Sequence, residues 1–258
     1  MSLADRTAIV KRTEVTHDAF LGGRLTLAQP AKGFRAGLDS VLLGSAVGHG
    51  SGRILDLGAG VGTAALVALA DHPGLSATLV DTDRAALALA AENIASNGFT
   101  TRADAVELDV TASGRARAAA GLRPDSFVSV IANPPYFEGG TRASARGGAA
   151  RQMPAAALDL WVKAAAMHAA PGGEVIFIHT ADSLPVLLAA MSARFGALTV
   201  LPLTPRDGEP AHRTLVRGIK GSRAPLTLLA SRALHTAGGR QFRAEFEAIF
   251  RGDDRLHW

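Results

Sequence analysis

The fold class follows from one stretch of the chain, Arg53-Ile54-Leu55-Asp56-Leu57-Gly58-Ala59-Gly60-Val61-Gly62-Thr63. Its first five residues are typical of a buried strand. The alternate glycines that follow predict a tight turn whose backbone a ligand can approach closely, because glycine has no Cβ. The next residues predict a helix over about 63–70. A strand, a glycine-rich turn and a helix form the first part of a βαβ unit, the repeating element of α/β proteins.

Strand and helix patterns alternate over the rest of the chain. Strands are predicted at about 77–80, 105–108, 127–131, 174–178, 198–201, 215–219 and 226–229, and helices at about 83–97, 155–170 and 183–195. Upstream, apolar residues around Gly22-Gly23 predict a hairpin with a two-residue turn, and Asp39 or Ser40 is the expected N-cap of a helix near Leu38. This alternation predicts a doubly wound, mainly parallel α/β sheet with ligand sites at the carboxyl ends of its strands.

Composition bounds the class of protein. The 258 residues are 48% hydrophobic and 19% charged, as in a globular chain. We expect one domain over 1–258, with a hairpin and helix over 1–48 and a core over 49–258. The absence of cysteine excludes disulfides, thiolate zinc sites, iron–sulfur clusters and cysteine nucleophiles, and the eight histidines lack metal-ligand spacing, so no metal site is expected. With no membrane-length apolar run and no secretory signal, we expect a cytoplasmic protein.

The glycine-rich turn differs from a dinucleotide-binding fingerprint. That fingerprint has the spacing G-x-G-x-x-G, whereas here the glycines alternate and Thr63 stands where its third glycine would be. Asp56, which ends the strand, would repel a pyrophosphate but suits a cationic amine. An acid followed by Gly58, Ala59 and Gly60 fits the aminocarboxypropyl arm of S-adenosylmethionine better than a dinucleotide. The alternative is a glycine-rich turn with no ligand.

Two further acids follow predicted strands. Asp81 lies about 20 residues beyond the glycine turn, where a carboxylate can accept hydrogen bonds from both ribose hydroxyls of an adenosine. Asp109 can accept a hydrogen bond from the adenine amino group, and the alternative for this residue is a solvated loop acid. Thr82 and Val110 stand next to these acids and belong to the same expected cofactor site. Asp83 is the expected N-cap of the next helix.

The most specific motif is Asn133-Pro134-Pro135-Tyr136, which follows a predicted strand. The two prolines fix the backbone and remove two amide donors, so this turn presents carbonyl groups. The Asn133 side-chain oxygen and the Pro134 carbonyl offer two acceptors to one planar NH2 group, which favours a pyramidal nitrogen with its lone pair aimed at a methyl donor. Tyr136, the only tyrosine, can stack on a base turned out of its strand. The alternative is a rigid polar turn that caps the strand.

Positive charge is concentrated in the second half of the chain. The net charge is +4, and residues 140–258 carry 15 basic and 9 acidic side chains, against 12 and 14 in residues 1–139. Such an excess permits contact with the phosphates of a nucleic acid. The alternative is that arginine simply replaces lysine throughout this chain. The expected phosphate-binding residues are Arg142, Arg146, Arg151, Arg213, Arg217 and Lys220.

These motifs resemble those of class I S-adenosylmethionine-dependent methyltransferases that carry an Asn-Pro-Pro-Tyr motif and methylate amines. Within that group, the bacterial tRNA1(Val) N6-adenine methyltransferase family is similar in two segments, Gly33-Phe34-Arg35-Ala36-Gly37-Leu38-Asp39-Ser40-Val41-Leu42-Leu43 and Arg213-Thr214-Leu215-Val216-Arg217-Gly218-Ile219-Lys220-Gly221. The resemblance covers about residues 35–180. It implies a Rossmann-like, seven-stranded, mainly parallel sheet with an antiparallel C-terminal strand.

The resemblance also implies roles for single residues. S-adenosylmethionine would be the cofactor, held by Asp56, Gly58, Gly60, Asp81 and Asp109. Arg35 and Asp39 would lie near its methionine end or near the base pocket. The segment from Asn133 to Tyr136 would hold the base, and the reaction would be methyl transfer to N6 of the adenine beside a tRNA anticodon, adenine 37. The arginine-rich segment 137–152 departs from the family pattern.

Other reactions stay open on the residues alone. Methylation at C5 of a pyrimidine generally needs a cysteine adduct and is excluded here. The same motif can hold a glutamine amide of a protein, as in release-factor methyltransferases, although only a short stretch precedes Gly33 where those enzymes usually carry a helical domain. Guanine N2 transfer also fits. From a different class, a catalytically silent RNA-binding module would not need Asp56, Asp81 and Asn133.

Overall fold

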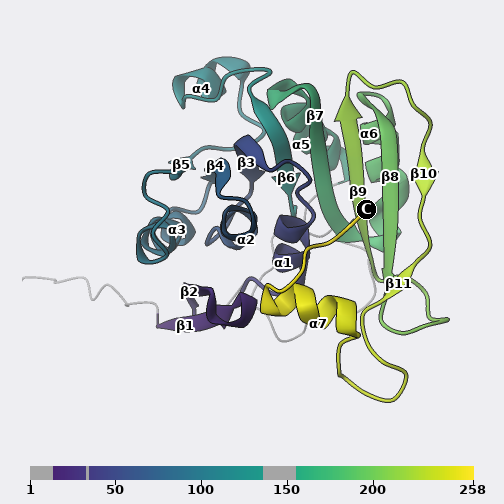
Figure 1. Ribbon diagram of the computed structural model, residues 1–258. Helices are drawn as coiled ribbons and strands as arrows, with labels where there is room; N and C mark the ends of the chain where they lie inside the picture. The colour runs from purple at the N-terminus through teal and green to yellow at the C-terminus, as the bar shows by residue number, and fades with distance from the viewer. Residues whose placement is uncertain (1–13, 33–34, 136–154) are drawn as a thin grey trace, which may run out of the picture.

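The structure, a computed structural model, describes residues 14–32, 35–135 and 155–258. Its centre is one sheet with the strand order β10-β8-β9-β7-β6-β3-β4-β5, and β11 pairs with β8 (Figure 1). The strands of this sheet are β3 (Ser51–Leu57), β4 (Gly74–Asp81), β5 (Ala103–Glu107), β6 (Phe127–Ala132), β7 (Ala169–Thr180), β8 (Phe195–Thr204), β9 (Arg213–Lys220), β10 (Thr227–Leu228) and β11 (Arg232–Ala233).

Strand directions confirm the predicted fold class. The strand β3 pairs in parallel with both β4 and β6, and β6 pairs in parallel with β7. The strand β9 runs antiparallel to both β7 and β8 and is the predicted antiparallel C-terminal strand. Within the described residues, the seven strands from β3 to β9 form the predicted doubly wound sheet, and the two-residue strands β10 and β11 extend it beyond β8.

Helices cover both faces of the sheet (Figure 1). Apolar residues alternate along the strands, so that Ile54 packs under α1 and α2 while Leu55 packs under α5. The same alternation separates Ile176 from Phe177 on β7 and produces two cores. The helices are α1 (Leu38–Ser45), α2 (Thr63–Asp71), α3 (Arg84–Ser96), α4 (Gly114–Ala119), α5 (Ala155–His168), α6 (Leu184–Ser192) and α7 (Ala244–Arg251), with a short 3-10 helix, η2 (Ala181–Ser183).

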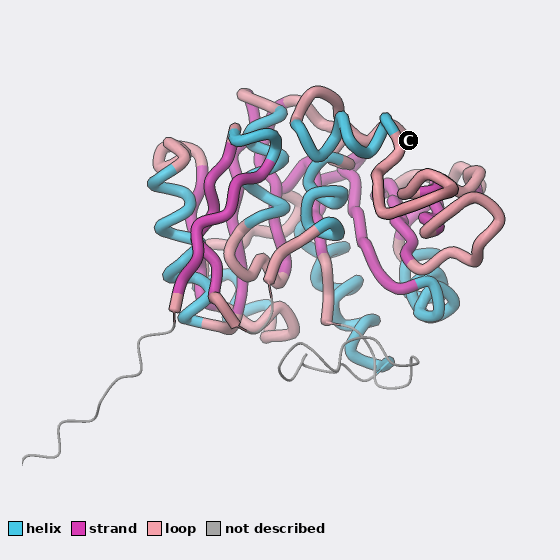
Figure 2. Tube along the Cα trace, turned by 90° about the horizontal axis from the view of Figure 1, so that it is seen from below, coloured by secondary structure: helices cyan, strands magenta, loops and turns pink. Residues whose placement is uncertain are grey.

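The N-terminal hairpin is present, but its predicted turn is wrong. The strands β1 (Val15–Phe20) and β2 (Leu25–Pro30) pair as far as Phe20 and Leu25, so the loop has four residues and contains the 3-10 helix η1 (Leu21–Gly23). Three consecutive loop residues, Leu21, Gly22 and Gly23, have positive φ, whereas a two-residue turn needs positive φ at no more than two positions. Figure 2, which views the molecule from this side, shows the paired strands lying across the helical layer.

Two local predictions need correction. The helix α1 begins at Leu38 with Gly37 as its N-cap, so neither Asp39 nor Ser40 caps it; Asp39 lies in the first turn, and Arg213 binds its carboxylate. The helix α7 was not predicted, although Phe246, Ile249 and Phe250 have helical spacing, and the first two are buried. By contrast, Asp83 is the N-cap of α3 as predicted, and it accepts from the backbone N–H groups of Ala85 and Ala86.

Asn93 joins the hairpin to the domain core. This side chain of α3 is fully buried, and its Oδ1 accepts from the backbone N–H of Ala28 at 2.6 Å. Its Nδ2 donates to the carbonyl oxygens of Ala28 at 3.1 Å and Val61 at 3.0 Å. One buried amide therefore connects β2, α3 and the glycine-rich turn before α2.

We expect Asn93→Ala to lower the free energy of unfolding by about 2 to 3 kcal/mol, because it leaves a buried N–H and two carbonyls without this partner. Urea unfolding followed by circular dichroism measures the change. The control is Ser96→Ala on the exposed side of the same helix, which should shift the value by less than about 0.5 kcal/mol. Equal effects of the two substitutions would show that the Asn93 amide does not anchor the hairpin.

Candidate functional site

The predicted site residues follow four neighbouring strands at one edge of the sheet. Leu57 of β3 is paired with Val80 of β4 and with Ala132 of β6, so these strands end side by side. Asn133 follows β6, the glycine-rich turn follows β3, and Asp81 closes β4. Parallel pairing thus brings together residues that are far apart in sequence.

The glycine-rich turn is held from one side and open on the other. The backbone N–H groups of Gly58 and Ala59 both donate to the Val80 carbonyl, at 2.8 and 2.9 Å. Gly58 has a φ of +71°, and a Cβ on it would lie 2.5 Å from the Trp161 ring. Gly60 has a φ of +55°, and nothing lies within 4 Å of where its Cβ would be. The turn therefore packs on a helix through Gly58 and leaves open space at Gly60.

Asp56 is a buried acid below this turn. Its carboxyl is 2% exposed and accepts from the backbone N–H of Ala65, in the first turn of α2, at 3.2 Å. Burial, opposed by the Ala65 hydrogen bond and aided by the nearby Asp81 charge, raises the pKa of Asp56 to about 7. A cation at this position would restore the charged form, since opposite charge favours ionisation.

Asp81 is oriented by backbone amides at both of its oxygens. Oδ2 accepts from the N–H of Gly60 at 2.8 Å, and Oδ1 accepts from the N–H of Asp83 at 2.9 Å. A carboxylate oxygen can accept more than one hydrogen bond, so this fixed carboxylate can still receive a pair of hydroxyls. Thr82, predicted as its neighbour in the site, is exposed beside it.

Asp109 lies just beyond β5 and stabilises its own loop. Its Oδ1 accepts from both the backbone N–H and the hydroxyl of Thr111, each at 2.7 Å. Oδ2 has no hydrogen bond within the described parts of the chain, and it is the atom left for an amino group. Val110 is buried in the core below. The role of Asp109 in cofactor binding stays a prediction.

The turn after β6 has the polarity that its sequence predicts. Pro134 is buried and Asn133 is half-buried. Asn133 contributes an amide side chain, and the two prolines at 134 and 135 have no backbone N–H. Among the described residues, no hydrogen bond involves the Asn133 side chain, so its oxygen is available to a ligand. Tyr136 lies outside the described residues.

Asp39 and Arg213 form an ion pair at the same edge. The Arg213 Nε donates to Asp39 Oδ2 at 2.9 Å, and both side chains are less than a third exposed. They line a cavity of about 210 Å³ together with apolar Leu38 and Leu203 and with His212. The cavity lies between α1 and the ends of β8 and β9 that point to the site. A predicted cofactor residue and a predicted RNA-binding residue are therefore partners of each other.

Arg35 follows the hairpin in sequence, and its side chain packs against it. Its guanidinium donates to Asp18 of β1 at 2.5 Å, to Thr16 Oγ1 at 2.8 Å and to the Pro30 carbonyl at 3.0 Å. These contacts brace the two strands of the hairpin. They give Arg35 a local structural role, and its predicted contact with the cofactor or the base is not among them.

Two of the predicted phosphate-binding residues, Arg217 and Lys220, have partners within the protein. Lys220, at the far end of β9, donates to Asp125 and to the carbonyls of Ala166 and Ala169, at the edge of the sheet opposite the site. The Arg217 guanidinium packs over the Trp258 ring, 4.5 Å from its centre, and burial lowers its pKa. Arg142, Arg146 and Arg151 lie outside the described residues.

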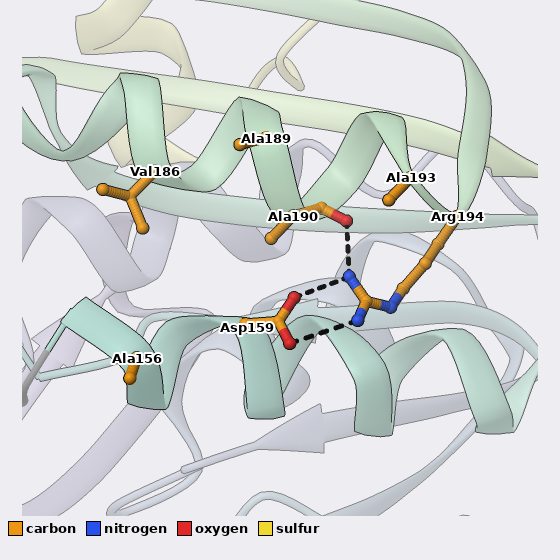
Figure 3. Close-up of a pocket in the computed structure, with 7 residues that line it drawn as sticks. All are labelled: Ala156, Asp159, Val186, Ala189, Ala190, Ala193 and Arg194. Atoms are coloured by element: carbon orange, nitrogen blue, oxygen red, sulfur yellow. Dashed lines mark hydrogen bonds and ion pairs between the residues drawn. The ribbon is translucent and has the colours of Figure 1, made fainter.

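A second hollow lies on the helical layer. It is a groove of about 450 Å³ between α5 and α6, lined by small side chains such as Ala156 and Ala189 (Figure 3). Arg194 crosses it to form a two-pronged ion pair with Asp159, at 2.7 and 3.2 Å. None of the predicted site residues lines this groove.

In the described ranges, no three histidine, aspartate or glutamate side chains are grouped so that they could hold a metal ion. No helix in the same ranges has the length and apolar character needed to cross a membrane.

Comparison with known proteins identifies a family. The family model described as "Methyltransferase small domain" matches residues 38–204. The tRNA1(Val) (adenine(37)-N6)-methyltransferase of Vibrio vulnificus is 28% identical over 200 residues, which cover 74% of this chain and 78% of that protein. The release factor glutamine methyltransferase of Caulobacter vibrioides is 40% identical over 89 residues, but this match covers only 34% of this chain and 28% of that protein. A Bacteroides thetaiotaomicron tRNA1(Val) enzyme is matched over 41% of its length.

Solved structures agree with the fold. A protein from Agrobacterium tumefaciens, described as a predicted O-methyltransferase, is 32% identical with a TM-score of 0.72, covering 84% of this chain and 98% of that one. A geranyl diphosphate methyltransferase in complex with S-adenosylmethionine has a TM-score of 0.52 at 12% identity and covers 70% of this chain and 84% of that one. The second likeness concerns the fold alone.

The site geometry fits S-adenosylmethionine, the cofactor of this family. The open space at Gly60 leaves room for part of the cofactor to lie against the turn. The buried Asp56 carboxyl suits its cationic amine, and the fixed Asp81 carboxylate suits its ribose hydroxyls.

We expect the affinity for S-adenosylhomocysteine to rise about tenfold from pH 6 to pH 8 and then level off, because the Asp56 carboxyl, with a pKa of about 7, must lose its proton to bind an amine cation. Titration calorimetry across this range measures it. Asp56→Asn should bind weakly with no such trend, and the control Asp83→Asn should keep the trend. A flat profile in the unsubstituted protein would contradict this role.

Without ligand, the raised pKa of Asp56 makes the fold less stable as pH rises towards 7, since the unfolded chain releases this proton at a lower pH than the folded chain does.

Proposed function

Because this chain belongs to the methyltransferase small domain family, whose model matches residues 38–204, we propose that it methylates the exocyclic N6 amine of an adenine in RNA, at adenine 37 of a tRNA anticodon loop. The observation that carries the proposal is the turn after β6. This turn follows the strand beside β3, and it combines an amide oxygen that has no hydrogen bond to the other described residues with two prolines that lack N–H groups.

This turn can hold an amine in a reactive orientation. The Asn133 Oδ1 and the Pro134 carbonyl would each accept one N–H of the amino group. Two such hydrogen bonds draw the nitrogen lone pair out of the ring system. S-adenosylmethionine, when bound, supplies an electrophilic methyl group. The contribution of the protein is then alignment, with no covalent intermediate on a side chain, which agrees with a chain that has no cysteine.

The nature of the acceptor is supported by chemistry and by relatives. A hydroxyl group has only one hydrogen to donate, so it would use half of this pair of acceptors. The tRNA1(Val) enzyme of Vibrio vulnificus matches 74% of this chain, whereas the match to the release factor enzyme covers 34% of it. A glutamine amide of a protein is the second candidate, because it presents the same NH2 group and the shorter match has the higher identity, 40%.

The direct experiment uses labelled methyl groups. The protein is incubated with methyl-labelled S-adenosylmethionine and unmodified tRNA, and in parallel with a release factor, and the products are digested to nucleosides or amino acids. We expect label in N6-methyladenosine. Label in methylglutamine alone, or in N2-methylguanosine, would replace the proposed acceptor with that one.

We expect Asn133→Ala to lower kcat at least about a hundredfold, since a hydrogen bond that aligns a reacting group is worth this much, and to change the Kd for S-adenosylhomocysteine less than twofold. Single-turnover kinetics and calorimetry measure the two quantities. Ser126→Ala, at the other end of β6, is the control and should leave both unchanged. A large loss of cofactor affinity in Asn133→Ala would mean that this residue belongs to the cofactor site instead.

The two ends of β9 provide a matched test of RNA contact. Arg213→Ala should weaken tRNA binding and lower the slope of log Kd against log salt by about 1, because Arg213 lies at the site edge of the sheet. Lys220→Ala, at the opposite edge, should leave the slope unchanged. Filter binding over a range of salt concentrations measures both. The reverse result would move the RNA to the other edge of the sheet.

A further inference from the structure

His179 is a fully buried titratable residue beside the site. It lies near the end of β7, two residues after Phe177, which is paired with Ala132 at the end of β6. The turn of residues 133–135 begins directly after Ala132. The pairing of β6 with β7 therefore places the His179 ring next to this turn.

The hydrogen bonds of His179 determine its tautomer. Nδ1 accepts from the backbone N–H of Thr180 at 2.9 Å. A backbone N–H can only donate, so Nδ1 carries no proton and the neutral ring has its proton on Nε2. The Pro135 backbone lies close enough to the ring to act on its pKa. Since Nδ1 is occupied, Nε2–H is the group that can donate to the Pro135 carbonyl, and in the structure this contact falls short of hydrogen-bond geometry.

The surroundings keep the ring neutral. Burial lowers the pKa of His179 to about 4, and the nearby Arg213 lowers it too. The Pro135 carbonyl and the charges of Asp182 and Asp39 act in the opposite direction without cancelling this effect. Near neutral pH the ring is therefore an uncharged group with one donor and one acceptor, each directed at the backbone.

The proline pair needs such a donor. Residues 134 and 135 have no N–H, so this part of the turn cannot attach itself to the sheet by donating hydrogen bonds. Its carbonyls can only be held by a donor from another element. Among the residues that the structure describes, His179 brings a ring N–H next to Pro135.

We propose that His179 is a positioning residue, whose Nε2–H holds the Pro135 carbonyl and so fixes the orientation in which Asn133 and Pro134 face the acceptor amine. The inference rests on the proposed role of this turn in binding an NH2 group. Hydrogen bonds in catalytic sites are often long without substrate and tighten when it binds, and we expect the contact between Nε2–H and Pro135 to close in this way.

Nuclear magnetic resonance tests the tautomer without any substrate. In nitrogen-15 spectra of the full chain near pH 7, the His179 ring, assigned by its loss in His179→Gln, should show a protonated Nε2 and an unprotonated Nδ1. The pattern should persist to pH 5. A ring protonated at Nδ1, or at both nitrogens, at pH 7 would overturn the proposal.

Three substitutions separate positioning from packing. His179→Gln keeps an N–H near the place of Nε2, His179→Asn keeps an acceptor near the place of Nδ1, and His179→Phe keeps only the bulk. We expect kcat to fall about 10- to 100-fold in the Asn and Phe variants, to recover to within about fivefold in the Gln variant, and the Kd for S-adenosylhomocysteine to stay within twofold in all three. The fold of each variant is checked by circular dichroism.

The outcomes distinguish the two proposals. Equal losses in the Gln and Asn variants, or a loss of cofactor affinity that parallels kcat, would assign His179 to core packing alone. An unsubstituted protein that methylates no tRNA but does methylate another amine would overturn the proposed acceptor. The same variants, measured on that amine, would still test His179.

Discussion

The parallel pairing of β3 with both β4 and β6 is the constraint on which the site depends. It makes three strand ends coincide, so that Asp56, Asp81 and Asn133 meet although they are far apart along the chain. Slipping one strand by a single residue would exchange its two faces and direct Asp56 into the other core. The register is maintained because the two cores each require one set of alternate side chains.

Burial and polarity are balanced closely around this edge. Asp56 is buried to a degree that raises its pKa to about 7, and the amide of Ala65 at the start of α2 only partly offsets that burial. Gly58 is required because a side chain would collide with Trp161, whereas Gly60 borders open space. Two glycines of one turn thus serve different purposes, one facing the protein and the other facing the position of the ligand.

Much of the candidate site can be predicted from patterns of neighbouring residues. The glycine turn, the acids at strand ends and the Asn-Pro-Pro turn are local signals, because strand, turn and helix are encoded by neighbouring residues. The arrangement of the predicted phosphate-binding residues, by contrast, is not a local signal. Arg213 and Lys220 are seven residues apart on one strand, about 23 Å, so they lie at opposite edges of the sheet, and Lys220 is bound by backbone carbonyls there.

Local patterns in the sequence were enough to predict the doubly wound class, most strands and helices, and the residues at the ends of strands, since these depend on neighbouring residues; the helices α4 and α7 were missed. Tertiary structure alone decided the partners: Asn93 with the hairpin, Asp39 with Arg213, and His179 with the turn at Pro135. These contacts join residues between 44 and 174 positions apart, as the numbers of His179 and Pro135 and of Arg213 and Asp39 show. Local patterns carry no signal for them, because each contact exists only once strand pairing has placed its two sides together.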